Sequence, residues 1–329
     1  MKKTLIYGVL CLALCFSCND EIDTQETPLS NELNQNRMLS FESMDDLKNT
    51  LDQFSTFNSN EDYENWLLQQ DFKSLYSSDV VSIEEKDNTP YTFLFILNEN
   101  KEFRVGDKII TYSDNLFYEN SIDESGHTIK ENNVIGHFEQ ELSEVGETEL
   151  SGNENRLISI TNGSEYKPSS AWREFTRQKY LTNNCSGLVY KSLKYRLIHY
   201  LAVESVTIGA YTTSNLNFRL RMSYKTSSGW KYNNTSTGRL YDVNLSGFAL
   251  IRLQNTAIPG TTKYFTLDEQ NGCFNAYKGT KTFPIHSYTY LTGIPNLSYY
   301  KWDINIAGSV KHQVNGDKIQ NIFDTTINW

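Results

Sequence analysis

Apolar residues follow a helical period near the start of the folded part of the chain. They recur at three- and four-residue spacing at Met44, Leu47, Leu51 and Phe54, which predicts an amphipathic helix with one buried face. A second, shorter helix is predicted over residues 59–67. Each stretch begins at a serine that is followed three residues later by an aspartate, a combination that caps helix N-termini.

Beyond residue 88 the pattern changes to short apolar stretches separated by polar turns. The run Tyr91–Leu97 predicts a strand, and the stretch 101–118 predicts a small antiparallel meander with turns at Gly106 and Asp114. Residues 38–120 are therefore predicted to form an α+β domain. Residues 121–155 are acidic and poor in large apolar side chains, so we expect them to be a linker or loop region.

The C-terminal part, residues 156–329, has the period of two that is typical of strands. Residues 218–225 alternate cleanly between apolar and mostly basic side chains, as expected for a strand buried on one face. Further strand candidates follow, separated by turn clusters and without a long helix. The pattern predicts an all-β antiparallel sandwich of jelly-roll or immunoglobulin-like type.

The N-terminus has the features of a bacterial export signal. Two lysines precede an apolar run, Leu5–Phe16, which is too short to span a bilayer as a helix. Ser17 and Cys18 end this run and resemble a lipobox, so residues 1–17 are predicted to be a signal peptide and Cys18 to carry lipid, including palmitate. The alternative is an ordinary signal with Cys18 left as a free thiol. Residues 18–37 are polar and are predicted to be a tether.

Three short features carry a resemblance to a known group of proteins. The lipobox is followed by the acidic run NDEID, and the stretch LNENKEFRVGDKIITY follows the two predicted helices. Together they resemble surface lipoproteins of unknown function from Bacteroidota. The resemblance implies a lipid-anchored protein of the outer membrane or cell surface, and it implies no specific activity.

Charge divides the sequence into two parts of opposite sign. Residues 19–155 hold 31 acidic and 8 basic side chains, whereas residues 156–329 hold 9 acidic and 20 basic ones. Such a split suggests that the two parts dock on each other or face different partners. Composition drift between two separately solvated domains is the alternative. Nucleic acid is not expected as a partner of an exported protein.

Basic side chains gather on one face of the alternating strand. Arg219, Arg221 and Lys225 point the same way from it, and Lys194 and Arg196 lie on a second candidate strand. If the two strands are neighbours, these residues form a cationic patch for an acidic polysaccharide, a lipid headgroup or the acidic part of this same protein. The alternative is a solvated face that protects the sheet from aggregation.

Other candidate residues are few. Trp230 follows a predicted turn, where an exposed indole could stack on a sugar ring. The alternative is a tryptophan buried in the core. Cys185 and Cys273 remain after lipidation of Cys18 and form a possible disulfide, or else two separate thiols. No catalytic constellation is recognised, and neither histidine nor cysteine spacing indicates a metal site, so no cofactor or metal is predicted.

These observations predict a lipid-anchored cell-envelope protein with a non-enzymatic binding or adhesion role. One alternative is a glycan-binding accessory of a polysaccharide-uptake system. Another is a hydrolase acting on a cell-surface or host glycan, such as a glycoside hydrolase, which would need two carboxylates in one cleft. An envelope protein partner also stays open.

Overall fold

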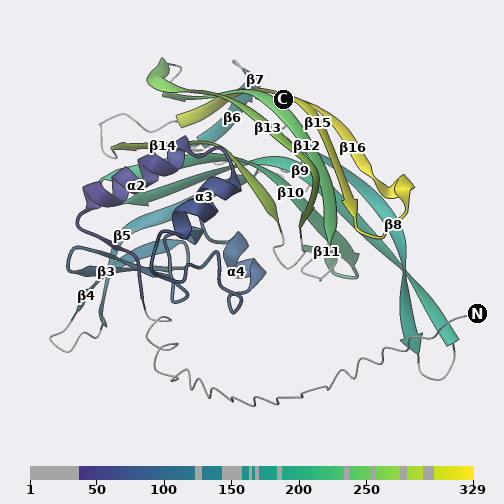
Figure 1. Ribbon diagram of the computed structural model, residues 1–329, viewed down its shortest axis with the longest axis horizontal. Coiled ribbons are helices and arrows are strands. Elements are labelled where there is room, and N and C mark those ends of the chain that lie inside the picture. The colour runs from purple at the N-terminus through teal and green to yellow at the C-terminus, as the bar shows by residue number, and fades with distance from the viewer. Residues whose placement is uncertain are drawn as a thin grey trace, which may run out of the picture.

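The computed structural model describes most of the residues beyond position 36 (Figure 1). The described ranges are 37–122, 128–142, 158–162, 165–166, 170–183, 187–232, 238–253, 256–274, 280–291 and 300–329. The predicted signal peptide, tether and lipidated Cys18 lie outside them. So does Cys185, the predicted disulfide partner of Cys273.

Helices are few and short. They are α2 (Met44–Thr56), α3 (Asn60–Leu67), α4 (Ile83–Asp87) and the two 3₁₀ helices η1 (Tyr91–Leu94) and η3 (Ile319–Asn321). Ser43 caps α2 by accepting the Asp46 amide at 3.2 Å, and Ser59 forms a reciprocal capping box with Asp62 at the start of α3. Both helices predicted from the sequence, and both capping serines, are thus confirmed.

A ten-stranded sheet forms the larger layer. Its strands are β1 (Ser40–Phe41), β2 (Glu102–Val105), β3 (Lys108–Ser113), β4 (Leu116–Ile122), β5 (Thr128–Leu142), β8 (Ser170–Asn183), β9 (Gly187–Ile208), β10 (Tyr211–Thr226), β11 (Gly229–Tyr232) and β14 (Lys281–Leu291). Its pairs are antiparallel except β1 with β2. Because β5 pairs with β9, strands from the acidic and the basic part of the sequence share this one sheet.

A six-stranded sheet forms the second layer. Its strands are β6 (Ile158–Asn162), β7 (Glu165–Tyr166), β12 (Arg239–Leu253), β13 (Thr256–Phe274), β15 (Tyr300–Val314) and β16 (Phe323–Asn328). The pairs are antiparallel except β6 with β15. Gly247 and Gly308 lie at positive φ where β12 and β15 approach closely, and a Cβ on either would collide with the facing backbone.

The main core lies between the two sheets. Leu216, Phe218 and Leu220 of β10 point into it and share one buried cluster with Leu245 of β12 and Ile306 of β15. The intervening residues of β10 therefore point to the other face of the ten-stranded sheet. The strand predicted over residues 218–225 is confirmed and extends to Tyr211–Thr226.

The N-terminal helices cover part of that other face. Figure 1 shows α2, α3 and α4 gathered on one side of the molecule, close to β3, β5 and β14. The apolar side chains of α2 and α3 form a second core with Phe138 of β5 and with Val206 and Ile208 of β9. Polar contacts join the two parts as well, because the Asn60 amide donates to the Thr282 carbonyl at 2.9 Å.

The run Tyr91–Leu97 was predicted to be a strand, and this prediction is wrong. Tyr91–Leu94 form the 3₁₀ helix η1, and every residue from 91 to 97 is buried. An unbroken apolar run has no alternation that separates a buried strand from a buried helical turn. Pro90 precedes the run and favours a turn at this position.

Part of the expected linker is also corrected. Residues 128–142 of the segment 121–155 form β5, which pairs with β4 and β9. Six of its 15 residues are acidic or carry an amide. Ile129 and Val134 are exposed while Phe138 is buried. Its strand pattern is therefore hidden by polar residues that face solvent.

The protein is mostly β-sheet with few helices, in two sheets. This confirms the β-rich architecture that the sequence predicts for the C-terminal part, while the type of sandwich and the separate α+β domain stay predictions. No helix among the described residues is both long enough and apolar enough to cross a membrane.

Candidate functional site

The outer face of β10 carries a buried ion pair. Arg219 donates through Nη2 to Oε1 of Glu204 on the neighbouring strand β9, and the two side chains are 8% and 0% exposed. Burial lowers the pKa of Arg219, but the charge and hydrogen bond of Glu204, together with the charges of Tyr200 and Asp87, raise it above its usual value. Arg219 is therefore a permanent positive charge inside the protein.

Glu204 also connects the sheet to residues 44–94, which hold α2, α3, α4 and η1 and which we call the helical segment. Its Oε2 accepts the backbone N–H of Tyr91 at 2.9 Å, at the start of η1, and the amide of Asn217 at 3.3 Å. Its Oε1 accepts the amide of Gln140 from β5 at 3.2 Å. Together with Arg219, donors from two strands and one helix thus satisfy a single carboxylate, which is what burial of a charge requires.

A cavity of about 280 Å³ adjoins this ion pair. It lies between the helical segment and the strands, and side chains from both line it. From the helical segment come Asn60, Glu64, Tyr76, Lys86, Asp87, Thr89, Tyr91 and Leu94, and from the strands and the residue before β14 come Arg219, Cys273, Phe274, Thr280, Lys281 and Thr282. Cavities with aromatic walls and a few charged groups are the usual sites for small ligands.

Asp87 lies at the cavity within the field of three arginines. Burial raises the pKa of its carboxyl, and the positive charges of Arg219, Arg221 and Arg239 act in the opposite direction, as does a hydrogen bond of 3.3 Å from Thr280. Burial lowers the pKa of Arg239 to about 9, and the charge of Asp87 opposes that change. The guanidinium of Arg239 lies 4.5 Å from the centre of the Phe274 ring, which lines the cavity.

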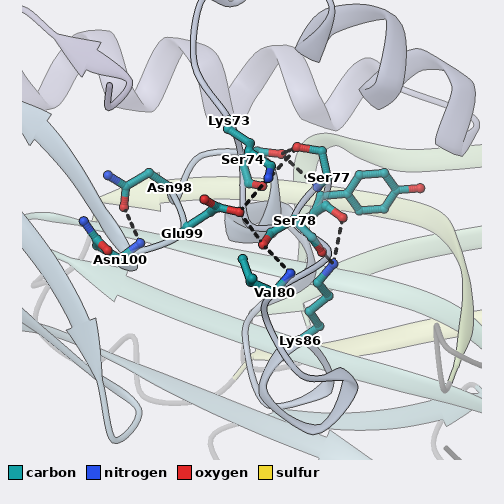
Figure 2. A network of polar contacts seen from close by, with 10 residues as sticks. Lys73, Ser74, Ser77, Ser78, Val80, Lys86, Asn98, Glu99 and Asn100 are labelled. Atoms are coloured by element: carbon teal, nitrogen blue, oxygen red, sulfur yellow. Dashed lines mark hydrogen bonds and ion pairs between the residues drawn. The ribbon is translucent and has the colours of Figure 1, made fainter. Parts of the chain in front are cut away.

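A polar network holds the wall formed by residues 73–100 (Figure 2). Lys86 donates from Nζ to the carbonyls of Tyr76 at 3.0 Å and of Ser78 at 2.5 Å. The Ser78 hydroxyl donates to Glu99 at 2.6 Å, and Lys73 pairs with the same carboxylate at 3.0 Å. Burial raises the pKa of Glu99, but these two partners together bring it below its usual value.

A second feature lies on the same sheet face, further along β10. The guanidinium of Arg196 lies between two indoles, 4.5 Å from the ring centre of Trp172 on β8 and 3.9 Å from that of Trp230 on β11. Glu174 accepts two hydrogen bonds of 3.2 Å from Arg196, and Lys225 Nζ lies 5.2 Å from the Trp230 ring. We call Trp172, Arg196 and Trp230 the indole ladder.

The structure divides the basic face predicted from the sequence. Arg219, Arg221 and Lys225 do alternate along β10, and Arg196 lies on the adjacent β9. Arg219 and Arg221 are each only 7% exposed, so they do not share an open surface with Lys225. The binding role predicted for these residues stays a prediction. The covering helices explain the difference, because they bury the end of the strand that carries both arginines. Lys225 is exposed and Trp230 half-buried.

Several residues of the cavity were not predicted. Asp87, Lys281 and Tyr91 come from separate parts of the sequence, as does Glu204, which pairs with Arg219 beside the cavity, and no local motif connects them. Cys273 lines the cavity as an exposed cysteine without a disulfide partner among the described residues. Its predicted partner Cys185 lies outside the described residues, so this pairing stays a prediction.

Comparisons with known proteins give little to transfer to this protein. No protein family and no curated protein matches the sequence. Among solved structures, a DUF4848 family protein from Bacteroides thetaiotaomicron aligns over 90% of this chain and 98% of its own, with 13% identity and a TM-score of 0.20. A likeness at this level supports no argument about function.

Proposed function

We propose that this protein is a non-enzymatic ligand-binding or adhesion protein of the cell envelope. Lipid on Cys18 would hold it at the outer membrane or cell surface, and the cavity beside Arg219 would be its binding site. The support for anchoring is the apolar run that ends at Ser17 and Cys18. A jelly-roll or immunoglobulin-like sandwich preceded by an α+β domain is part of the same proposal.

One observation carries the binding site: a buried arginine lines a cavity of about 280 Å³. A buried charge costs free energy, and the Arg219–Glu204 pair alone gives weak reason to keep it, since apolar replacements of buried pairs are often neutral or stabilising. The free-energy cost of burying Arg219 is explained if this arginine also binds a ligand. Tyr91 and Phe274 add aromatic surface to the same wall.

The hydrolase alternative has less support. A glycosidase requires two carboxyl groups on either side of the scissile bond. The carboxylates of the described residues that line the cavity are Glu64 and Asp87, and Glu64 accepts a hydrogen bond of 2.5 Å from the Tyr76 hydroxyl. One of the two is thus engaged by the wall itself, so we propose binding rather than hydrolysis.

The thiol of Cys273 gives a direct test of the cavity. In the Cys185→Ser background, attachment of a bulky maleimide to Cys273 should abolish ligand binding, because Cys273 is exposed and lines the cavity. Binding to an extract of small envelope metabolites is measured by calorimetry. Mass spectrometry then identifies the compounds that the protein retains. Cys273→Ser, treated with the same reagent, is the control and should bind as before. Equal retention by labelled and unlabelled protein would refute the cavity as the site.

Glycan capture is the second candidate, and the indole ladder favours it. Trp172 is 40% exposed, and the ring positions are fixed by Arg196 and by its ion pair with Glu174. Rigid aromatic surface flanked by charged hydrogen-bonding groups suits a sugar ring, which presents C–H groups on its face and hydroxyls at its edge. This candidate places the ligand on an open surface of β8, β9 and β11.

The glycan candidate predicts a specific loss. Trp230→Ala should abolish retention on immobilised neutral glycans at high salt, because removal of the ring eliminates the stacking surface and releases Arg196 from one of its two indoles. Affinity electrophoresis measures this retention. The control is Tyr264→Ala, an aromatic that is 79% exposed on β13 of the other sheet. If neither variant changes retention, the ladder is a structural feature of the sheet.

A further inference from the structure

Arg219 has donors to spare beyond its ion pair. It gives Nη2 to Glu204, while its Nε is buried with no hydrogen-bond partner among the described residues. A guanidinium has five donors. Among the described residues Glu204 takes one of them, so Arg219, which lines the cavity, keeps donors other than the buried Nε for an acceptor there. Lys281 brings a second positive charge to the cavity wall.

The carboxylates nearby are largely committed to other donors. Glu204 accepts from four groups, and Glu64 accepts from the Tyr76 hydroxyl. Glu269, whose carboxylate lies 3.7 Å from Lys281 Nζ, accepts the Tyr241 hydroxyl at 2.7 Å. Asp87 is the remaining carboxyl of the described cavity wall, and it accepts a hydrogen bond from Thr280 at 3.3 Å.

Asp87 shows the sign of the field inside the cavity. Burial raises the pKa of Asp87, and the three guanidinium groups of Arg219, Arg221 and Arg239 each act in the opposite direction, so the field of these side chains at Asp87 is positive. A second negative group placed beside it would meet the same three charges. Such interactions are stronger inside a protein than in water because the effective dielectric constant is lower.

The rest of the wall is aromatic and apolar. Tyr91, Phe274 and Leu94 are at most 7% exposed and line the same cavity. A volume of about 280 Å³ lies just below the range of about 300–1,000 Å³ that ligand sites usually have. The wall therefore fits a small body with one apolar or ring-shaped side.

From this juxtaposition we infer that the cavity binds a small organic anion, with its carboxylate or phosphate at Arg219 and Lys281 and its apolar body against Tyr91 and Phe274. The inference rests on the proposed function, since it names the class of ligand for the same cavity. The negative charge of Asp87 on the cavity wall would repel such an anion. Its removal should therefore strengthen binding.

The experiment compares probes that share one ring and differ in charge. Benzoate, phenyl phosphate and the neutral benzamide are titrated into the full-length protein by calorimetry. We expect the two anions to bind and benzamide to bind at least tenfold more weakly, which corresponds to about 1.4 kcal/mol. The ratio between benzoate and phenyl phosphate then tells which anionic group the cavity prefers.

Two substitutions place the anion. Lys281→Gln should weaken benzoate and phenyl phosphate about tenfold, and Asp87→Asn should tighten them severalfold, because each changes one charge on the wall. Neither residue takes part in the Arg219–Glu204 pair, so both variants should fold. Lys311→Gln is the matched control: this lysine is exposed on β15 of the other sheet, and its loss should leave binding unchanged.

The outcomes separate the inference from the proposed function. If benzamide binds as tightly as benzoate, the cavity is a binding site but not for anions, and the inference is overturned while the proposed function stands. If anions bind but Lys281→Gln and Asp87→Asn have no effect, they bind elsewhere and the inference is also overturned. If no probe binds and Cys273 labelling changes no retention, both fail.

Discussion

Glu204→Gln is expected to lower the free energy of unfolding by about 3–5 kcal/mol. The substitution keeps the size of the side chain but removes the charge that faces Arg219, and both residues are buried. Arg219 cannot neutralise itself by losing a proton, since a guanidinium stays protonated in proteins. Urea unfolding followed by tryptophan fluorescence measures the loss, which is a large fraction of the stability of a typical domain.

Two further variants test whether that loss of stability comes from leaving the buried charge of Arg219 unpaired. Glu174→Gln also breaks an ion pair with an arginine, Arg196, but one that is partly exposed, so it should cost no more than about 1 kcal/mol. The double variant Glu204→Leu with Arg219→Leu removes both buried charges and should recover most of the stability. A cost for Glu204→Gln as small as that for Glu174→Gln would mean that water reaches Arg219.

Mild acid is expected to destabilise the protein by way of two buried histidines. His199 on β9 and His312 on β15 are both 0% exposed, and their ring centres lie 5.5 Å apart between the two sheets. Burial lowers the pKa of His199 to about 3. Burial also lowers the pKa of His312 well below its usual value, with the charges of His199 and Arg239 acting in the same direction. None of the four ring nitrogens has a hydrogen-bond partner among the described residues.

The direction of the pH effect follows from proton binding. Below a pH of about 6.5 the unfolded state protonates both histidines while the folded state does not. The unfolded state then binds more protons, so stability falls as the pH falls, by up to about 2.7 kcal/mol per pH unit for the pair. For the pair of histidines alone, stability should therefore drop by roughly 4.5 kcal/mol between pH 6.5 and 4.5. Carboxyls with a lowered pKa, such as Glu99, act at lower pH, and Asp87 with its raised pKa offsets part of the loss.

Denaturant midpoints at half-unit pH steps test this expectation. His199→Phe should reduce the slope between pH 6.5 and 4.5 by about half, because it removes one of the two histidines. A phenyl ring should fit at this position, since the imidazole of His199 stacks on Phe323 with 4.4 Å between the ring centres. His137→Gln changes a histidine whose side chain is 47% exposed and should leave the slope as it is. An unchanged slope in His199→Phe would show that this histidine becomes protonated without unfolding.

Local patterns were sufficient for the parts of the fold that local physics decides. The helices that begin after Ser43 and Ser59 follow from apolar spacing and capping residues within one or two turns. The strand containing Phe218 follows from alternation, because one of its faces meets an apolar core. In these cases the interaction that fixes the element lies within a few residues along the sequence.

Contacts between residues far apart in the sequence determine the parts of the fold and of the site that local patterns did not predict. The alternation of Arg219 and Arg221 placed them on one face of β10, but only the distant segment around Tyr91 determines that this face is covered. The cavity shows the same limit, since Asp87 and Lys281 are almost two hundred residues apart in the sequence. Trp230 was predicted as a candidate stacking residue, but its neighbours Trp172 and Arg196 come from other strands, which no local pattern indicates.

The position of β9 in the ten-stranded sheet has a consequence for how the protein is made. Strands β1 to β5 are complete by residue 142, but the edge of β5 pairs with residues 202–208 of β9. During synthesis this edge of β5 therefore stays unpaired until about sixty further residues have been added to the chain. An open strand edge invites pairing with other molecules, and sheets joined by such distant segments form slowly. We therefore expect a newly made molecule to need a chaperone that shields β5 until β9 arrives.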